Sequence, residues 1–431
     1  MRKFPMRKRG KSCASFFIQT YGCTLNQSDT DAMRAFLQFK GFKEAPAEQE
    51  ADIVILNTCT VKSATEQKIM ERIRRLVKQK KKLVIAGCLA INENALKEAA
   101  PCAPIVYPCA TNAIDRAVRA ALKSKRIVFR TPTEKAMLPR IFTGVIAKIP
   151  IAEGCTGACT FCQTRLARGK LRSYPSWWVE WLIRHGIRRG AIEIQLTAQD
   201  TGAYGIDIKS SLPELINRLL EIEGSFLVRL GMINPEHALK MKEPLVRALS
   251  SYKFYGFLHI PVQSGSDEVL KRMARRYTSQ EALEVFRFFR AKFPDMTLAT
   301  DIIVGFPGES DEDFEKTLAF LREVKPDIVN VSKFTARPGT AAKKMKPLPT
   351  QIVKRRSEIC AKLCREIAEQ NNARFVGREE VFIITEMQKT PTGRTIDYRQ
   401  VALAKGSGRL GEQVKGKIID ARHSCLLAER I

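Results

Sequence analysis

Short β-rich runs and helical stretches alternate along the first part of this 431-residue chain, and this alternation restricts its fold more than any other feature. Between residues 13 and 125 we expect strands at Ser15–Tyr21, Asp52–Asn57 and Lys82–Ala86. The stretches with helical spacing are Gln27–Lys40, Ser63–Gln79 and Asn92–Ala100. Strands that are joined by helices run parallel, with helices covering the sheet. The pattern therefore predicts an open parallel α/β domain.

A cysteine follows each of these three strands, namely Cys23, Cys59 and Cys88, with Gly22 and Gly87 beside two of them. Ligands of open α/β sheets bind at the carboxyl ends of the strands. Three thiols that are far apart in sequence should therefore meet at one edge of the sheet. We expect them to hold an iron–sulfur cluster through three thiolates; the alternative is three unrelated buried cysteines.

A second set of three cysteines lies within one short loop. Cys155, Cys159 and Cys162 have the spacing C-x3-C-x2-C. Three thiolates can hold a cubane cluster and leave one iron without a protein ligand. This spacing resembles the signature of radical S-adenosylmethionine (SAM) enzymes, whose open iron chelates SAM. The alternatives are buried cysteines, a disulfide, and a zinc site, which needs a fourth ligand at short spacing; the nearest candidate, His185, lies in a helical stretch.

The remaining cysteines lack a position at a strand end, and we interpret them as packing residues: Cys13, Cys102, Cys109, Cys360, Cys364 and Cys425. Twelve cysteines in a chain without a secretory signal favour reduced thiols and metal sites over disulfides. The basic N-terminus is followed by no apolar signal region. A reducing cytoplasm would suit such a protein.

A second block of alternating elements begins after a connector at residues 125–140. Its candidate strands are Val145–Ala152, Ile192–Thr197, Phe226–Gly231, Gly256–Gln263, Leu298–Val304 and Ile328–Phe334. Its helical stretches include Trp177–Arg189, Pro213–Glu223, Gln280–Lys292 and Asp311–Val324. Six strand–helix units predict a partial TIM-type barrel, whose site faces the carboxyl ends of the strands. The loop of Cys155, Cys159 and Cys162 follows the first strand, at that end.

The last part of the chain has a different pattern. A basic helical stretch, Gln351–Arg374, precedes strands expected at Val381–Glu386, Thr395–Ala404 and Gln413–Leu427. Glycine-containing turns are expected between them, at Thr392-Gly393, at residues 406–408 and at Gly411. Short strands with such turns predict a small antiparallel β-barrel, a type often used to bind RNA.

Polar residues at the ends of the central strands are candidates for contacts with a cofactor: Gln199, Asp200, Arg229, His259, Gln263 and Ser264. A guanidinium such as that of Arg229 can pair with a carboxylate through two hydrogen bonds. Gly305 would let a flat adenine approach the backbone. For each, the alternative is an ordinary structural role. Ser310 and Asp313 should form a capping box for the helix that follows.

The net charge of +28 favours a polyanionic partner, either nucleic acid or an anionic membrane surface. No apolar run of about 18 residues is present, so we expect no membrane span. Arg165, Arg168, Lys170 and Arg172 follow the cysteine loop directly. They could form a rim that faces phosphate, with a solvated loop as the alternative.

Taken together, these residues resemble the tRNA methylthiotransferase family over nearly the whole chain. The resemblance rests on the segments YGCTLNQSD at 21–29, NTCTV at 57–61 and AGC at 86–88, on the cysteine loop and on the final barrel. The sequence after Cys162 resembles the archaeal and eukaryotic branch, which acts on N6-threonylcarbamoyladenosine. One departure is Leu89-Ala90-Ile91, where relatives more often have a Pro-Gln-type run.

The resemblance implies three domains: 13–125 with a second [4Fe–4S] cluster, 141–350 with the radical-SAM site, and 375–431, a TRAM-like RNA-binding barrel. It also implies the reaction. The cluster of Cys155, Cys159 and Cys162 would cleave SAM to a 5′-deoxyadenosyl radical that abstracts hydrogen from C2 of the adenine. The cluster of Cys23, Cys59 and Cys88 would deliver sulfur, and a second SAM would supply the methyl group.

Phe161, between the last two cysteines of the loop, joins the cofactor-binding candidates. The implied partners are tRNA, an electron donor and a sulfur source. One competing interpretation is a radical-SAM enzyme of another type, such as one that methylates RNA or modifies a ribosomal protein; simple methylation would not need Cys23, Cys59 and Cys88. A second is a methylthiotransferase of a related branch that acts on another modified adenosine. Another is a cysteine-rich RNA-binding protein that uses zinc structurally.

Overall fold

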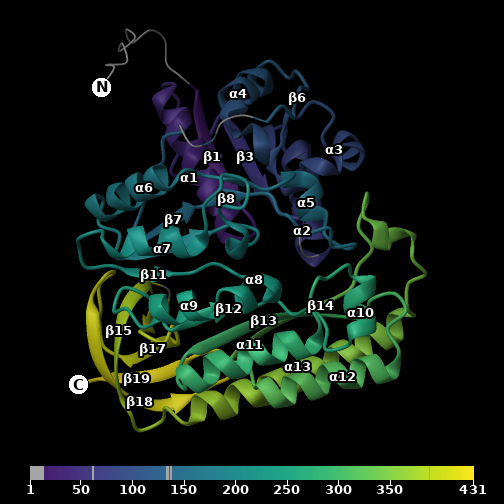
Figure 1. Ribbon diagram of the computed structural model, residues 1–431. Coiled ribbons are helices and arrows are strands. Elements are labelled where there is room, and N and C mark those ends of the chain that lie inside the picture. Colours follow the sequence, from purple (N-terminus) through teal and green to yellow (C-terminus); the bar gives the residue numbers. More distant parts are fainter. Residues whose placement is uncertain (1–13, 61–62, 133–134, 136–137, 388) are drawn as a thin grey trace. The chain divides into compact units, whose positions relative to one another are not determined.

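The computed structural model describes residues 14–60, 63–132, 135, 138–387 and 389–431, shown in Figure 1. Cys13 and the basic N-terminal run lie outside these residues. The chain divides into two compact units, Met1–Ile141 and Phe142–Ile431. No helix in the described part of the chain is long and apolar enough to cross a membrane.

The first unit contains a six-stranded parallel sheet with the strand order β2-β1-β3-β4-β5-β6, as the alternation predicts. Its strands are β1 (Ser15–Thr20), β2 (Lys43–Glu44), β3 (Ile53–Thr58), β4 (Lys82–Gly87), β5 (Ile105–Val106) and β6 (Val128–Phe129). Its helices are α1 (Thr24–Phe39), α2 (Ser63–Lys78), α3 (Glu93–Ala99) and α4 (Ile114–Leu122), with short 3-10 turns η1 (Glu48–Glu50), η2 (Cys88–Ile91) and η3 (Pro108–Ala113).

Helices cover both faces of this sheet. Ile53 and Ile55 of β3 pack in the cluster that includes Met33 of α1 and residues of α4. Val54 and Leu56 point to the opposite face and pack in the cluster with α2 and α3. Successive side chains of a strand point to opposite faces, so a strand that is buried on both sides must be apolar throughout. This explains the uninterrupted run Ile53–Leu56.

The second unit begins with six parallel strands in two groups, β7-β10-β11 and β12-β13-β14. A bridge between Val228 and Phe254 extends β11 toward β12. The strands are β7 (Ile146–Pro150), β10 (Glu193–Thr197), β11 (Leu227–Arg229), β12 (Phe257–His259), β13 (Thr297–Val304) and β14 (Ile328–Lys333); β8 (Ala152–Glu153) and β9 (Arg172–Ser173) form a small separate pair. The predicted partial barrel is confirmed.

Its helices include four that the periodicity did not reveal because each spans only six to eight residues: α5 (Gln163–Arg168), α8 (Pro235–Lys240), α9 (Lys242–Leu249) and α10 (Asp267–Arg272). The longer ones match the expected stretches: α6 (Ser176–Arg188), α7 (Leu212–Leu220), α11 (Ser279–Lys292) and α12 (Asp311–Val324). The capping box of Ser310 and Asp313 is present at the start of α12. Two 3-10 turns, η4 (Thr201–Ala203) and η5 (Ala341–Lys344), complete this part.

After α13 (Thr350–Ala373), five strands close into a barrel in the order β15-β16-β17-β19-β18. They are β15 (Glu379–Met387), β16 (Pro391–Thr395), β17 (Gln400–Lys405), β18 (Gln413–Ala421) and β19 (Leu426–Arg430). The pairs are antiparallel except β17 with β19, which is parallel. The small barrel is confirmed, although three strands were expected.

Three local predictions in this barrel were wrong. The expected turn at Thr392-Gly393 lies inside β16, because Gly393 lets the strand approach β15: a Cβ there would lie 2.3 Å from the carbonyl oxygen of Ile383. The expected strand Thr395–Ala404 is broken by a turn at residues 396–399, where Tyr398 has a φ of +64°. The expected strand Gln413–Leu427 is two strands, β18 and β19.

This turn of the small barrel contacts the amino ends of the central strands. Gly256, just before β12, donates its amide to the Ile396 carbonyl at 2.8 Å. Thr297, which begins β13, donates its hydroxyl to the Asp397 carbonyl at 2.6 Å. The Tyr398 ring packs against Phe257 with ring centroids 4.6 Å apart. These contacts lie at the end of the strands opposite the cysteine loop.

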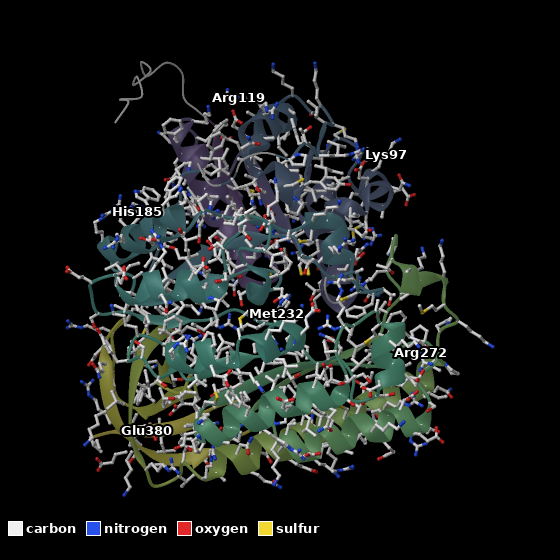
Figure 2. All side chains as sticks on the ribbon, viewed as in Figure 1. Lys97, Arg119, His185, Met232, Arg272 and Glu380 are labelled. Carbon is white, nitrogen blue, oxygen red and sulfur yellow. The ribbon has the colours of Figure 1, made fainter. Side chains whose placement is uncertain are left out.

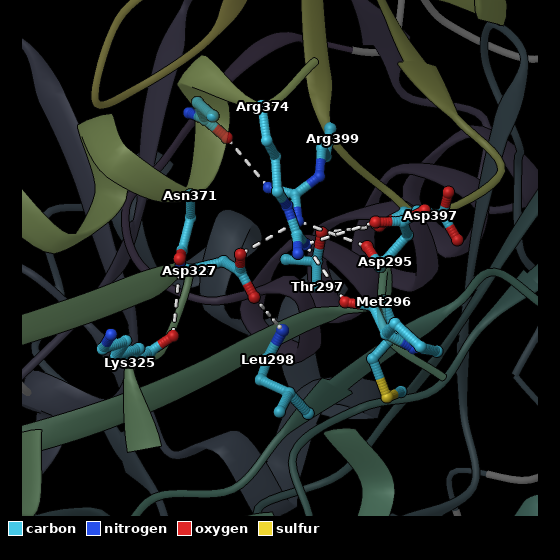
Figure 3. Close-up of polar contacts among 12 residues, drawn as sticks. Asp295, Met296, Thr297, Leu298, Lys325, Asp327, Asn371, Arg374, Asp397 and Arg399 are labelled. Atoms are coloured by element: carbon cyan, nitrogen blue, oxygen red, sulfur yellow. Dashed lines mark hydrogen bonds and ion pairs between the residues drawn. The ribbon is translucent and has the colours of Figure 1, made fainter. Parts of the chain in front are cut away.

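A buried carboxylate holds the same contact together, as Figure 3 shows. Asp327 accepts from Arg399 at 2.9 Å and from the Leu298 amide at 2.9 Å. Arg290 donates to it at 2.7 Å. The side chains of Asp327 and Arg399 are 2% and 3% exposed, so neither charge has water as a substitute partner.

We predict that Asp327→Ala lowers the free energy of unfolding by about 3–5 kcal/mol, because it leaves the buried Arg399 charge without its carboxylate partner. The control is Glu323→Ala, which removes the partner of the exposed Arg287 and should cost no more than about 1 kcal/mol. Thermal unfolding of both variants checks this. Equal midpoints for the two variants would contradict the structural role of Asp327.

Candidate functional site

The three strands that precede Cys23, Cys59 and Cys88 are neighbours in the sheet, in the order β1-β3-β4. Cys23 is exposed and caps the start of α1, whereas Cys59 and Cys88 are buried. Asn26 connects the three segments. Its side-chain amide donates to the Tyr21 and Thr58 carbonyls at 2.7 Å each, and its Oδ1 lies 3.9 Å from the Cys88 Sγ.

Two glycines allow the backbone segments to approach at this edge. Gly22 has a φ of +102°, and a Cβ on it would lie 2.8 Å from the Cβ and 2.9 Å from the Sγ of Cys59. Gly87 has a φ of +93°, and a Cβ there would lie 2.4 Å from the Thr58 carbonyl oxygen. Both positions therefore require glycine. The unusual run after Cys88 has an apolar role, since Leu89 and Ala90 are fully buried against this unit's core.

In the second unit, the loop of Cys155, Cys159 and Cys162 follows β8 at the carboxyl end of the first barrel strand. All three cysteines are partly buried. A Cβ on Gly157 would lie 3.4 Å from the Cys155 Sγ and 3.7 Å from the Cys159 Sγ. Both sulfurs therefore lie next to the space that a side chain at position 157 would occupy.

Hydrogen bonds and burial act on these thiols in opposite directions. The Gly157 amide donates to the Cys155 Sγ at 3.2 Å, and the Arg275 Nη1 donates to the Cys159 Sγ at 3.1 Å. Burial raises the pKa of the Cys155 thiol to about 11, and burial also raises the pKa of Cys162. Such thiols lose their protons when a cation takes the place of the proton.

The spread of the sulfurs distinguishes the kinds of metal group that would fit. A tetrahedral zinc site, with Zn–S bonds of about 2.3 Å, would bring its sulfurs to about 3.8 Å from one another. In neither cysteine triplet do all three sulfurs lie within 4.8 Å of one another; among the described residues, only Asp200, Glu236 and His237 bring three donor atoms that close. Each set supplies three thiols, the number that holds a cubane cluster with one iron left open, whereas a structural zinc site has four protein ligands.

A polar network lies behind the loop. Arg275, which contacts Cys159, also donates to the Asn234 Oδ1 at 2.5 Å. The Asn234 side chain donates to the Asp200 Oδ2 at 2.5 Å, and the Gly202 amide donates to the Asp200 Oδ1 at 3.1 Å. Burial raises the pKa of Asp200, while the nearby His237 lowers it. Gln199 accepts from the Gly154 amide at 2.6 Å and so holds the start of the loop.

The other predicted cofactor residues are distributed along the barrel. Phe161 packs edge-on against Phe306, with ring centroids 6.4 Å apart. The His259 Nε2 lies 3.1 Å from the Asp301 Oδ2. Gln263 has a φ of +75°, and its backbone N–H donates to the Asp301 carbonyl.

Three candidates are engaged inside the protein. The Arg229 guanidinium lies over the Phe257 ring, 4.8 Å from its centroid, toward the amino end of the strands. Ser264 is fully buried beside Thr317, with 3.3 Å between their hydroxyl oxygens. The space next to Gly305 that was assigned to an adenine is filled by Val353, whose Cγ2 would lie 2.6 Å from an added Cβ.

The predicted phosphate-facing rim after the loop is partly wrong. Arg168 is fully buried and donates to the Glu153 Oε1 at 2.9 Å. Arg172 donates to the other oxygen of Glu153 at 3.1 Å. This pairing joins the two ends of the cysteine loop, because Glu153 precedes Cys155 and both arginines follow Cys162. The hydrophobic pattern could not reveal this ion pairing, because charged residues look the same in a sequence whether they are buried or exposed.

The packing role predicted for the other cysteines is confirmed for Cys109, Cys360 and Cys364, which are buried. It is wrong for Cys102, which is exposed, and Cys425 is only partly buried. Among the residues that sequence reasoning missed, Asn26 lies inside a quoted motif. Asn234 follows β11 and Arg275 follows α10, and neither carries a motif signal of its own.

Comparisons with known proteins agree with this geometry. Residues 15–126 match the model of an uncharacterized protein family, UPF0004, and residues 149–321 match that of the Radical SAM superfamily. A radical SAM methyltransferase from Kitasatospora setae, TsrM, has a TM-score of 0.53 at 13% identity, and the alignment covers 77% of each chain. At that identity the likeness shows the fold alone. The chain is a radical-SAM enzyme, a class that binds SAM and a [4Fe–4S] cluster.

Full-length relatives narrow this class. The chain is 39% identical to a probable threonylcarbamoyladenosine tRNA methylthiotransferase from Pyrococcus horikoshii over 96% of this chain and 99% of that one. It is 42% identical to one from Archaeoglobus fulgidus over 96% and 97%, and 34% identical to the human protein over 94% and 72%. The chain belongs to the threonylcarbamoyladenosine tRNA methylthiotransferase family.

Proposed function

We propose that this protein adds a methylthio group to C2 of N6-threonylcarbamoyladenosine in tRNA, beside the anticodon. The observation that carries the proposal is the presence of two sets of three cysteines, each at the carboxyl ends of parallel strands. Transfer of a methylthio group needs a sulfur-bearing site besides the one that cleaves SAM. The net charge of +28 suits a tRNA substrate.

In this proposal Cys155, Cys159 and Cys162 hold the cluster at which SAM binds, and Cys23, Cys59 and Cys88 hold a second [4Fe–4S] cluster. The clusters supply one-electron cleavage of SAM and a place for sulfur; the protein supplies binding, orientation and exclusion of water. The corresponding domains are 13–125, 141–350 and 375–431. An electron donor and a sulfur source are further partners, and the reducing cytoplasm remains the expected compartment.

The side chains around the cysteine loop have distinct roles in the proposed reaction. Gln199 holds the Gly154 amide, and the Glu153–Arg168 pair closes the base of the loop, so the three thiols keep their relative positions. Arg275 places a positive charge beside the Cys159 sulfur. Phe161, Gln199 and His259 are partly exposed and remain candidates for direct contact with SAM.

Mass spectrometry of tRNA nucleosides tests the function. In cells that lack this protein, the C2-methylthio derivative should disappear and N6-threonylcarbamoyladenosine should accumulate. The wild-type gene should restore the derivative, and neither Cys159→Ala nor Cys59→Ala should do so. An unchanged nucleoside profile in the deletion strain would contradict the proposal.

The glycine at the first-unit site provides a separate prediction. Gly22→Ala introduces a methyl group against the Cys59 thiol, so iron and sulfide per chain should fall toward half while SAM cleavage persists. Gly190→Ala is the matched control: its φ is +90°, but a Cβ there has no neighbour within 4 Å. It therefore adds only backbone strain and should retain both clusters. Full iron content in Gly22→Ala would argue against a cluster at this edge.

Arg275 allows a test of the loop site by its redox behaviour. A positive charge beside a thiolate ligand stabilises the more negative, reduced cluster, so Arg275→Gln should lower its midpoint potential by about 50–100 mV. Arg287→Gln is the control, because Arg287 is exposed and pairs with Glu323 rather than with a residue of the cysteine loop. A redox titration followed by electron paramagnetic resonance measures both. Equal midpoint potentials in Arg275→Gln and wild-type protein would show that Arg275 does not act on this cluster.

A further inference from the structure

Helix α6 of the barrel has an outer face whose composition is unusual for a solvated helix. Its inner face packs on the barrel through Trp178, Val179, Leu182, Ile183 and Gly186, all buried. The outer stripe consists of Trp177, Trp181, Arg184 and Arg188, which are spaced so that they share one side of the helix. We call these four residues the α6 stripe.

Its two tryptophans are strongly exposed. Trp177 is 57% exposed and Trp181 is 47% exposed, whereas Trp178 between them is 3% exposed. Packing on this chain therefore explains Trp178 and leaves the other two indole rings facing solvent. Trp181 lies parallel to the His185 ring, with centroids 5.3 Å apart and an interplanar angle of 2°; Figure 2 labels His185 on this helix. This stacking on His185 covers one face of the Trp181 indole.

The charge around these rings is positive. Arg184 and Arg188 are exposed, and no carboxylate within the described ranges lies close enough to pair with either guanidinium. The acidic residue of α6, Glu180, contacts Arg218 and is thereby neutralised. Exposed aromatic rings flanked by free arginines fit a polyanion with flat bases better than a membrane or an apolar protein surface.

The α6 stripe begins at the end of the barrel that carries the cysteine loop. Strand β9 pairs with β8, so that Arg172 lies opposite Glu153, and α6 starts three residues after β9. Trp177 is the second residue of the helix. A helix that follows a barrel strand begins at the carboxyl end of that strand, which is where the site of this fold lies.

We propose that the α6 stripe binds an unpaired segment of RNA, with bases stacked on Trp177 and Trp181 and phosphates paired with Arg184 and Arg188. Bases of single-stranded loops are free to stack on aromatic side chains, and each base that does so contributes substantially to affinity. The identification of that RNA as the loop of the tRNA substrate rests on the proposed function. The stacking surface itself rests only on α6.

Binding of fluorescently labelled tRNA to the full chain tests this. Trp177→Ala/Trp181→Ala should weaken binding about 10- to 100-fold. Arg184→Gln/Arg188→Gln should reduce the slope of log affinity against log salt by about 1.4. Tyr252→Ala is the matched control: Tyr252 is 80% exposed but lies outside α6, and its removal should leave the affinity unchanged. SAM cleavage without RNA verifies that each variant is folded and loaded.

The outcomes separate this inference from the proposed function. If wild-type protein methylthiolates tRNA and the double tryptophan variant binds tRNA as tightly as wild-type protein does, the α6 stripe is not an RNA-binding surface. The proposed function is then still supported. If the double variant changes only the oligomeric state in sedimentation, the stripe contacts a second copy and the inference is wrong. If wild-type protein binds unpaired RNA through the α6 stripe but never modifies tRNA, the proposed function is wrong and the inferred RNA-binding surface is correct.

Discussion

The geometry of parallel strands is the constraint on which both cysteine sets depend. In a parallel sheet the carboxyl ends of neighbouring strands lie at one edge, so residues that follow β1, β3 and β4 meet although more than sixty positions separate Cys23 from Cys88. Glycines with left-handed backbone then remove the side chains that would fill the space between the segments. The same rule positions the loop of Cys155, Cys159 and Cys162 after the first barrel strands.

The opposite end of the barrel is closed. The turn at residues 396–399 packs on the amino ends of β12 and β13, and Asp327 fixes it through buried ion pairs. This closure makes the small barrel part of the same compact unit as the central strands. The cysteine loop lies at the other end, the carboxyl ends of the strands, where Gln199 and Arg275 contact it.

Periodicity and motif spacing were sufficient to predict the two parallel α/β blocks and the small barrel. That the six candidate cysteines hold clusters stays a prediction. They failed where tertiary contacts decide the local structure. Gly393 reads as a turn residue, yet it lies in a strand because β15 passes too close for a side chain. The sequence around Arg168 predicts a surface charge, yet Arg168 is buried and paired with the buried Glu153.

The same limit applies to the site. Arg275 lies 116 residues from Cys159, and only the folded barrel brings its guanidinium to the sulfur. Gly305 has the conformational freedom that was expected of it, with a φ of +75°, but Val353 of the distant α13 occupies the adjoining space. Local sequence specifies which conformations and contacts are open to a residue, and tertiary packing decides which neighbour it contacts.

In the proposed reaction, radical chemistry at the loop site is directed at C2 of a tRNA adenine. The most direct measurement uses tRNA that carries deuterium at that carbon and follows the label into 5′-deoxyadenosine by mass spectrometry. We expect wild-type protein to transfer the deuterium and the Cys159→Ala variant to form no 5′-deoxyadenosine. Formation of 5′-deoxyadenosine without the label, while the methylthio product accumulates, would contradict the proposed reaction.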